Sequence, residues 1–449
     1  MKIKKIKKII FTISLLAILP IPLFTQTILT VGEREKSDID YMPSNNVQDT
    51  LEIEQDPTEF SKQADPMTRE EQLDYDIRYN EKYFEPWQLS EMGLSEGEKT
   101  WQFMFAKRKM YRRYNERISK EWFKKQIKNS NFDNYDSLSK PAITTKHTNL
   151  KLYPTDKEFY YSSTRAGEGF PFDYNQNSSV HINTPIFVSH YSKDKKWVYA
   201  KTAFAFGWIK VEDMAFVTSK FQEKFQNGNY GIVTTDNLNI YDDEVLISLV
   251  KLGSIFPIDD KTQKYMVAKR GEKGYAKIKK FKPTEVNLIA KKPIKFNQFN
   301  IAFIGKQLVG EPYGWGGKLK TRDCSALTRD FFAPFGVYLP RNSSQQAHES
   351  DGVYMSLKGL SKEEKAVAIM TYGRPCRSLL FVKGHITLYL GQKENEPVIM
   401  HNFWGVRLKN GKKHIIGRSV ITTTEPGKER ADVKESSKLI NTFQGLVNF

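Results

Sequence analysis

Cysteine and histidine are scarce in this chain of 449 residues, which has two cysteines and seven scattered histidines. They do not show the close, paired spacing of zinc ligands. The sequence therefore predicts no metal and no other cofactor. A disulfide between Cys324 and Cys376 is not expected either, because it would block the thiol that the motifs below mark as reactive.

The chain also lacks a clear membrane-spanning segment at its start. Five lysines are followed by a mostly apolar run from Ile9 to Phe24. Sixteen residues are few for a span, which needs about 20, and they suit the core of a signal peptide. No clear small-x-small cleavage site follows, so residues 1–28 are either a signal peptide or an uncleaved membrane tether. No cysteine follows as in a lipoprotein, and we expect export to the periplasm or cell envelope.

Positive charge is sparse in one stretch and abundant elsewhere. Residues 31–76 hold 14 acidic and 4 basic residues, whereas the whole chain carries a net charge of +17. We expect residues 29–67 to form a disordered acidic linker. The basic remainder would be drawn to a polyanion, and for an exported protein that is a wall polymer or membrane surface rather than nucleic acid. Alternatively, the charge reflects composition alone.

One cysteine lies where a reactive thiol is expected. The Gly-rich stretch 313–317 precedes Asp323-Cys324-Ser325-Ala326, and the residues up to Phe332 are expected to form a helix that Pro334 stops. Cys324 would lie at the helix N-terminus, where unpaired N–H groups favour negative charge. This position predicts a lowered thiol pKa and a nucleophilic thiolate.

Two histidines follow on expected strands. His385 begins the alternating segment 384–391, and His401 lies within a second strand over 397–404. Antiparallel pairing of these strands would bring both imidazoles to the side of the sheet that faces Cys324. His385 would accept the thiol proton, and His401 would orient its ring.

These motifs resemble those of the NlpC-type cysteine peptidases, bacterial cell-wall hydrolases with a papain-like α+β fold. The resemblance covers roughly residues 297–410, and Ala326 stands where the family has glycine. It implies that Cys324 is the nucleophile, His385 the base and His401 the third member of a triad. It also implies an oxyanion site made by the Tyr313 side chain and the Cys324 backbone N–H.

Each of these residues also has a simpler interpretation. A lone cysteine is usually a small buried apolar residue, and a strand histidine is usually structural. Cys376 is expected to be a buried, idle thiol. Trp315 and Trp404 are expected to be core or cleft-wall aromatics, with Trp315 a candidate for substrate contact.

An internal repeat organises the middle of the chain. Residues 144–153 are echoed by 234–241, and the pairs 200–201 and 207–210 are echoed by 268–269 and 274–277. Both copies have the short, β-branched segments of small barrels. They resemble the paired bacterial SH3-like barrels of some NlpC-type enzymes, and we expect these barrels at residues 141–222 and 223–292.

The first copy contains an insertion that the second lacks. In NlpC-type enzymes with such barrels, the first barrel borders the active-site groove. We therefore expect Glu168, Asp173 and Tyr174 of this insertion to contact substrate, with a purely structural insertion as the alternative.

Residues 68–140 are expected to form a helical N-terminal domain that resembles the family's N-terminal clip. Ser95-Glu-Gly-Glu98 is a capping box and opens a basic amphipathic stretch from Thr100 to about Ile127. Such a helix packs on its own domain or lies on a membrane. The catalytic domain would span 293–449, with a first helix over 299–309.

The resemblance implies hydrolysis of the amide between γ-D-glutamate and a diamino acid, such as diaminopimelate, in peptidoglycan stem peptides. A free N-terminal L-Ala would be held by Asp323 and Ser325, with Ser343 as a further contact, because an ammonium in a narrow cleft needs a partner charge. No protein partner is indicated. The alternatives are a non-catalytic wall-binding protein and a thiol acyltransferase on the same fold.

Overall fold

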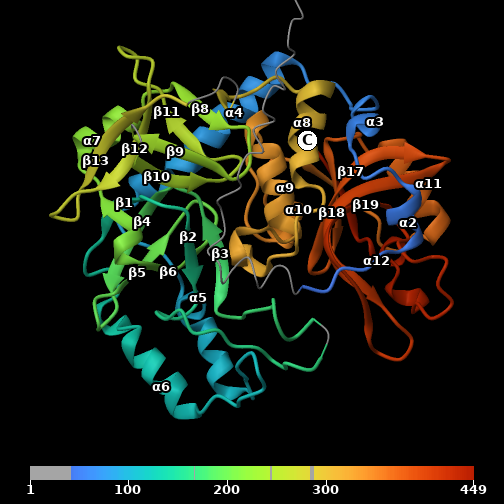
Figure 1. The fold of residues 1–449 in the computed structure, drawn as a ribbon, viewed down its shortest axis with the longest axis horizontal. Coiled ribbons are helices and arrows are strands. Elements are labelled where there is room, and N and C mark those ends of the chain that lie inside the picture. The colour runs from blue at the N-terminus through green and yellow to red at the C-terminus, as the bar shows by residue number, and fades with distance from the viewer. Residues whose placement is uncertain (1–41, 166, 243–244, 284–287) are drawn as a thin grey trace, which may run out of the picture. The chain divides into compact units, whose positions relative to one another are not determined.

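The computed structural model describes residues 42–165, 167–242, 245–283 and 288–449. Along the chain it forms a helical segment, a seven-stranded sheet, three smaller sheets and a C-terminal region of helices on a six-stranded sheet (Figure 1). Residues 1–28 and the first part of the predicted linker lie outside the described residues.

The N-terminal part is helical. Its α-helices and 3₁₀ helices are α2 (Gln48–Glu52), α3 (Thr58–Ser61), α4 (Arg69–Phe84), η1 (Glu85–Gln88), α5 (Glu96–Thr100), η2 (Trp101–Lys107), α6 (Lys120–Asn129) and η3 (Phe132–Asn134). The longest, α4, begins with a capping box in which Thr68 accepts the backbone N–H of Glu71.

The prediction of a disordered linker is wrong for residues 42–67. Val47 is buried against Ile416 and Val420. Asp49 is buried too, and accepts hydrogen bonds from the backbone N–H and hydroxyl of Thr423 at 2.7 and 2.6 Å. This acidic segment is ordered because its few apolar and carboxylate side chains find partners far along the chain.

The long basic helix expected after Ser95 is broken into separate pieces. The capping box itself is confirmed, with the Ser95 hydroxyl accepting the N–H of Glu98. After η2, however, the chain leaves the helix, and Tyr111 forms bridges with Arg117 and with Tyr160 in the loop of the first sheet. Asn115 has a positive φ of 66°, which no helix contains.

The first sheet has the strand order β3-β2-β6-β5-β4-β1-β7. Its strands are β1 (Lys140–Thr144), β2 (Thr148–Lys151), β3 (Gln176–Val180), β4 (Pro185–Tyr191), β5 (Trp197–Lys201), β6 (Phe206–Lys210) and β7 (Met214–Phe216), with η4 (Val211–Asp213) before the last. Its core is a cluster of buried aliphatic side chains that includes Val188, Val198 and Ile209.

Residues 223–292, predicted to form the second barrel, contain three small sheets ordered β10-β9, β11-β8-β14 and β12-β13. The elements are α7 (Ser219–Phe225), β8 (Tyr230–Val233), β9 (Leu238–Asp242), β10 (Val245–Val250), β11 (Ile255–Pro257), β12 (Tyr265–Arg270), β13 (Ala276–Phe281) and β14 (Ile289–Lys291). The hairpin β12–β13 is the counterpart of β5–β6, as the repeat predicts.

The C-terminal sheet is antiparallel, with the order β15-β20-β16-β17-β18-β19. Its strands are β15 (Val353–Ser356), β16 (Ser378–Val382), β17 (His385–Lys393), β18 (Glu396–Arg407), β19 (Lys413–Thr423) and β20 (Gly445–Asn448). The surrounding helices are α8 (Gln298–Leu308), η5 (Trp315–Lys320), α9 (Cys324–Phe332), η6 (Ala333–Phe335), α10 (Ser343–His348), α11 (Lys362–Tyr372), η7 (Glu435–Ser437) and α12 (Leu439–Thr442). Helix α9 packs on β17 and β18.

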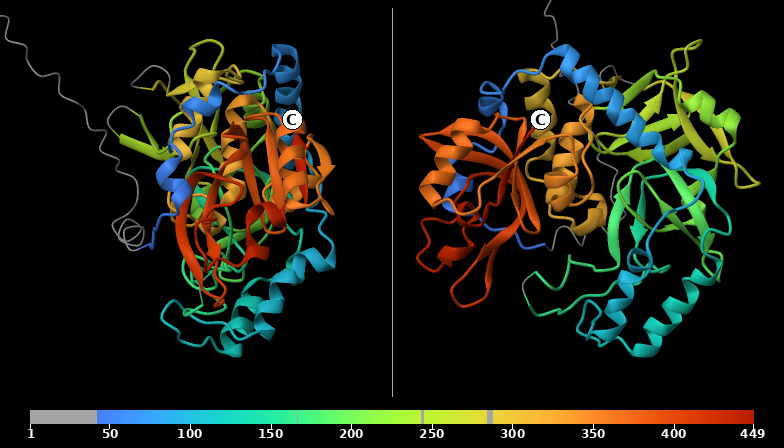
Figure 2. Two further views of the ribbon diagram at one scale, coloured as in Figure 1. Left: turned by 90° about the vertical axis from the view of Figure 1, so that its right-hand side faces the viewer. Right: turned by 180° about the vertical axis from the view of Figure 1, so that it is seen from behind.

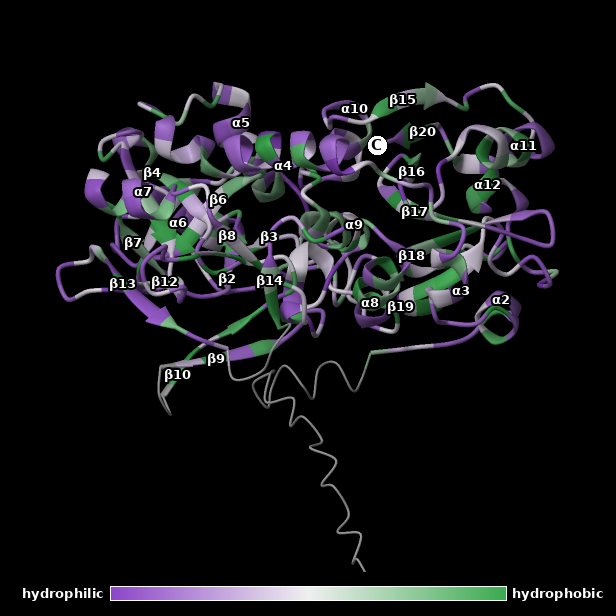
Figure 3. Cartoon of the chain, turned by 90° about the horizontal axis from the view of Figure 1, so that it is seen from above, coloured by the Kyte–Doolittle hydropathy of each residue, from purple (hydrophilic) through white to green (hydrophobic). Residues whose placement is uncertain are grey.

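Helix α4 connects the C-terminal region to the small sheets, and the rear view in Figure 2 shows it running diagonally between them. Arg377, just before β16, donates to Glu71 near the start of α4, and the Phe84 ring at its end lies 5.6 Å from the ring of Tyr230 in β8. Figure 3 shows purple and green segments along α4, and its buried side is mixed, because Gln72 and Asp76 are buried together with Tyr79 and Phe84.

Among the described residues, no helix has both the length and the apolar character needed to cross a membrane. The apolar run from Ile9 to Phe24 lies outside this part of the chain.

Candidate active site

The approach to the thiol is a tight loop that only glycine permits. Gly316 and Gly317 have φ values of 60° and 78°. A Cβ on Gly317 would lie 2.2 Å from the Ser179 hydroxyl, and one on Gly316 would lie 2.6 Å from the Gln176 carbonyl. The loop therefore packs against β3 of the first sheet, which places that sheet beside the start of α9.

Asp323 caps α9. Its carboxylate accepts the N–H of Ala326 at 2.9 Å and the N–H of Gly316 at 3.0 Å. Arg341 donates to both carboxylate oxygens, at 3.0 and 2.6 Å, and to the Ser325 hydroxyl at 2.8 Å. The Arg341 charge and these hydrogen bonds outweigh burial and lower the pKa of Asp323.

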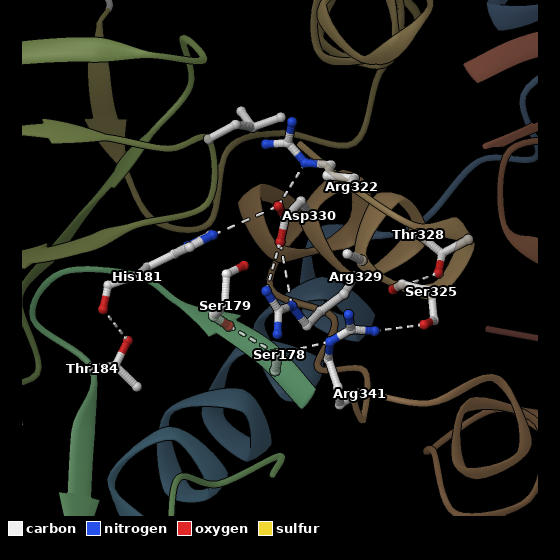
Figure 4. A network of polar contacts seen from close by, with 12 residues as sticks. Ser178, Ser179, His181, Thr184, Arg322, Ser325, Thr328, Arg329, Asp330 and Arg341 are labelled. Carbon is white, nitrogen blue, oxygen red and sulfur yellow. Dashed lines mark hydrogen bonds and ion pairs between the residues drawn. The ribbon is translucent and has the colours of Figure 1, made fainter. Parts of the chain in front are cut away.

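Figure 4 shows Arg341 between Ser325 of α9 and Ser178 of β3. A second buried contact lies farther along α9, where Asp330 accepts from Arg322 at 2.7 Å and lies 3.7 Å from His181. The helix that carries the thiol is thus held by polar contacts with the first sheet at both ends.

The thiol of Cys324 is protonated, contrary to the lowered pKa predicted from its helix position. Burial and the neighbouring Asp323 carboxylate raise the pKa of Cys324 to about 12, against the lowering effect of backbone hydrogen bonds from Ile386 and Ser325. Cys324 does lie at the helix N-terminus, as expected. The stabilisation that the helix N-terminus gives a thiolate is, however, smaller than the free-energy cost of burying that thiolate beside a carboxylate.

His385 and His401 lie side by side at the sheet face that α9 covers. The backbone N–H of Ile386, the residue after His385, contacts the Cys324 sulfur. His385 Nε2 lies 3.0 Å from His401 Nδ1, and His401 Nε2 lies 3.1 Å from the Thr422 hydroxyl. Burial lowers the pKa of His385 to about 4 and holds that of His401 well below its usual value, so both rings are neutral at pH 7.

The hydrogen bonds of Thr422 fix the tautomers of both rings. The Thr422 hydroxyl donates its one proton to the Thr423 carbonyl at 2.7 Å, so its oxygen accepts from His401 Nε2–H. His401 Nδ1 then carries no proton and accepts from His385 Nε2–H. The Nδ1 atom of His385 is left as an unprotonated acceptor, which is the form a general base needs.

A cavity of ≈ 790 Å³ opens beside the thiol. The predicted site residues that line it are Tyr174, Tyr313, Trp315, Asp323, Cys324, Ser325 and Ser343. Its other walls come from the helical segment, with Trp101 and Phe105, and from the first sheet, with Phe204 and Phe206. The helical segment, the first sheet and the C-terminal region therefore all contribute walls to the cavity in front of Cys324.

Two residues of the predicted substrate loop do not line this cavity. Asp173 is fully buried, and its carboxylate lies 3.6 Å from Lys151 and 3.3 Å from Lys318. The prediction of a substrate contact is therefore wrong for Asp173, which instead neutralises two buried lysines. Glu168 pairs with Arg165 at 3.6 Å. Tyr174 does reach the cavity, where its ring lies 5.7 Å from Trp315.

The sequence interpretation missed Arg341 and Thr422. Arg341 lies two positions before the predicted contact Ser343, but its pairing with Asp323 joins residues 18 positions apart. Thr422 belongs to an alternating strand in which nothing distinguishes it from Thr423. Among the described residues, no cluster of three or more histidine, cysteine or acidic side chains could hold a metal ion.

Comparison with known proteins agrees with this geometry. Residues 310–403 match the model of the NlpC/P60 family, residues 16–135 match the N-terminal NLPC_P60 stabilising domain, and residues 158–210 match an SH3 domain of the SH3b1 type. The chain therefore carries an NlpC/P60 domain together with the N-terminal clip and the SH3-like domain that its motifs predicted. None of the curated proteins matches it significantly.

A solved structure shares this fold. A structure described as a novel NlpC/P60 endopeptidase from Photobacterium damselae subsp. piscicida has a TM-score of 0.80 and 22% identity, covering 90% of this chain and 99% of that chain. An NlpC/P60 family protein from Bacillus cereus ATCC 10987 has a TM-score of 0.40 and 16% identity, covering 68% and 98% respectively. The predicted α+β fold with an SH3-like domain and a helical N-terminal part is confirmed. The family supports a cysteine peptidase acting on peptidoglycan, in an exported or cell-envelope protein.

Proposed function

We propose that this protein is an exported cysteine endopeptidase that hydrolyses the amide between γ-D-glutamate and a diamino acid in peptidoglycan stem peptides. The observation that carries the proposal is the hydrogen-bonded series His385, His401 and Thr422, which lies on the sheet face covered by α9, where Cys324 lines a large cavity. Pockets of this size accommodate small ligands such as a short peptide.

The reaction begins from a neutral Cys324 thiol and a neutral His385 imidazole. As the sulfur of Cys324 attacks the γ-carbonyl carbon, its proton passes to Nδ1 of His385. The Cys324 backbone N–H and the Tyr313 hydroxyl donate to the oxyanion of the tetrahedral intermediate. Tyr313 suits this role because burial and the nearby thiol raise its pKa well above 10, so it stays protonated as a donor.

Collapse of the intermediate breaks the carbon–nitrogen bond. His385 returns its proton to the leaving amine of the diamino acid, and an acyl-enzyme remains on Cys324. His385 then removes a proton from water, whose oxygen attacks the thioester carbonyl. The carbon–sulfur bond breaks, the γ-glutamyl product leaves with a carboxyl group, and His385 returns the proton to the Cys324 sulfur. His401 and Thr422 keep the His385 ring in the orientation that both proton transfers require.

A preference for stems with a free N-terminal L-Ala is the finer part of the proposal. Asp323, Ser325 and Ser343 line the cavity that holds the nucleophile and would accept from an ammonium group. Because Arg341 offsets the charge of Asp323, we expect this preference to be moderate rather than absolute.

Mass spectrometry of defined muropeptides tests the function. The protein without residues 1–30 is incubated with free L-Ala-γ-D-Glu-diaminopimelate and with the same stem attached to muramic acid. We expect release of L-Ala-D-Glu, faster from the free stem, and none with Cys324→Ala. Cys376→Ala is the matched control, because Cys376 is a second buried thiol whose pKa is also raised to about 12.

Each other outcome corrects a different part of the proposal. Equal cleavage of both stems would remove the amine preference and keep the peptidase. No cleavage, with retained binding to wall fragments, would favour a binding protein. Transfer of the glutamyl group to an added amine would favour an acyltransferase.

A further inference from the structure

Two cations face each other on the hairpin that follows His401. Arg407 at the end of β18 and Lys413 at the start of β19 are direct cross-strand partners. Side chains at such positions lie on the same face of a sheet, and like charges placed there are destabilising. Burial, together with the Arg407 charge, lowers the pKa of Lys413. An anion bound between the two side chains would relieve this repulsion.

Neither cation is neutralised by the part of the chain that the structure describes. The side chains of Arg407 and Lys413 have no hydrogen bond or ion pair among the described residues. Lys413 is nonetheless half-buried. Glu168, an acidic residue of the facing loop, pairs with Arg165 instead.

A third donor without an acceptor lies next to them. The Trp404 side chain is buried, and its indole N–H has no hydrogen-bond partner in the described structure. An unpartnered buried donor is costly. A ligand acceptor that reached this N–H would remove that cost.

Lys413 and Trp404 converge on one bare backbone position. A Cβ added to Gly167 would lie 3.1 Å from Lys413 Nζ and 3.9 Å from Trp404 Cδ1, the atom bonded to the indole nitrogen. Gly167 also has a φ of +82°, a conformation that side-chain-bearing residues rarely adopt. The backbone of this loop therefore lies close to both donors.

This position lies on the His385 side of the nucleophile. Phe403, the residue before Trp404, stacks on His401 with ring centroids 4.6 Å apart and contacts His385 at 5.7 Å. The charge of Lys413 also acts on the His385 ring. The cavity in front of Cys324, by contrast, is lined by Asp323, Ser325 and Ser343 and by neither Lys413 nor Trp404.

We propose that Lys413, assisted by Arg407 and the indole N–H of Trp404, binds the side-chain carboxylate of diaminopimelate in the leaving half of the substrate. The inference rests on the proposed function, in which His385 protonates the leaving amine, so a group held beside His385 belongs to the diamino acid. Lysine in the same stem position has no side-chain carboxylate. The site therefore selects diaminopimelate stems over lysine stems.

Binding without cleavage provides the first test. The full chain carrying Cys324→Ala is titrated calorimetrically with three tetrapeptide stems, which contain diaminopimelate, diaminopimelate amidated at the side-chain carboxyl, or lysine. We expect the first to bind about tenfold more tightly than the other two, as one charge-assisted contact allows. Equal affinities for the three stems would overturn the proposal.

Variants then assign the preference to residues. Adding Lys413→Met should remove the difference between the stems by weakening only the carboxylate-bearing one, and Lys413→Arg should restore part of it. Lys412→Met is the matched control, because Lys412 is exposed one position away. Trp404→Phe keeps an aromatic ring without the N–H and should reduce the preference by roughly twofold or more. A preference unchanged in Lys413→Met that melts like its parent would overturn the proposal.

Cleavage assays with intact Cys324 separate this inference from the peptidase proposal. If no stem is cleaved but binding still depends on the carboxylate and on Lys413, the carboxylate site stands and the peptidase fails. If all stems are cleaved equally and bound equally, the peptidase stands and the carboxylate site fails.

Discussion

At the scale of single residues, the candidate site is a row of neutral groups with fixed protons. Thr422 determines which nitrogen of His401 carries hydrogen, and His401 determines the same for His385. Burial keeps both imidazole rings and the Cys324 thiol uncharged. The base is therefore prepared by hydrogen bonding rather than by an ion pair with a thiolate.

Replacing Thr422 tests this arrangement. Thr422→Val leaves His401 Nε2–H without an acceptor, which costs about 1–3 kcal/mol and favours the wrong tautomer. We expect kcat to fall about tenfold or more with KM little changed, and Thr422→Ser to restore it. Loss of activity in both variants, at unchanged melting temperature, would contradict the role of the hydroxyl.

The pH dependence of kcat/KM provides a second test at this scale. A protonated His385 cannot accept the thiol proton, and its pKa is lowered to about 4. Activity should therefore persist from neutral pH to about pH 5 and be halved near pH 4, with circular dichroism confirming the fold at each pH. A midpoint near 6.5, the ordinary value for histidine, would show that the ring is solvated in the working enzyme.

At the scale of elements, the segment 42–61 is a strap on the outer strand of the catalytic sheet. Its backbone and side chains bond to β19 at Ile415, Ile421 and Thr423. An edge strand otherwise presents unpaired backbone groups. The strap covers this edge on the strand that also carries Thr422.

Removing the Asp49 carboxylate should loosen this strap. Asp49→Ala leaves the buried hydroxyl and N–H of Thr423 without their acceptor, and we expect unfolding to become easier by about 1–3 kcal/mol. Denaturant titration measures the change, with Glu54→Ala as control because Glu54 is exposed in the same segment. Equal, small effects of both changes would mean that the strap adds no stability.

At the scale of the whole described structure, a buried ion cluster joins the small sheets to the catalytic region. Arg322, the residue before Asp323, donates to Asp236 at 2.9 and 3.0 Å and to Glu311 at 2.9 Å. Asp236 also accepts from Lys251 at 2.6 Å. The start of α9 is thus positioned by a part of the chain more than 80 residues earlier, since Arg322 and Asp236 are 86 positions apart.

Breaking this cluster should affect both stability and activity. Asp236→Asn leaves Arg322 and Lys251 short of one buried counter-charge, which costs roughly 3–5 kcal/mol. Glu59→Gln, in the exposed pair with Lys62, should cost about 0–1 kcal/mol. Urea titration and peptide cleavage measure the two effects, and an Asp236→Asn protein as stable as Glu59→Gln would refute the importance of the junction.

The sequence alone determined the features that depend on neighbouring residues. The sequence predicted the helix at Cys324, the glycine loop before it, the strands of His385 and His401 and the capping box at Ser95. These features could be predicted because N-caps, positive φ angles and strand alternation each depend on a few neighbouring residues. The loop acid Asp173 was predicted wrongly, because exposure cannot be read from residue type.

Only the tertiary structure decided what depends on distant partners. The Asp49 carboxylate accepts a hydrogen bond from Thr423, which lies 374 positions away in the sequence. Contacts of this kind order the segment that the sequence predicted to be a disordered linker. The pairing of Arg341 with Asp323, the place of Thr422 and the burial of Cys324 follow from how α9 packs between two sheets. Because burial and neighbouring charge set a pKa, the protonation states of the site were decided at that level and not by the motif.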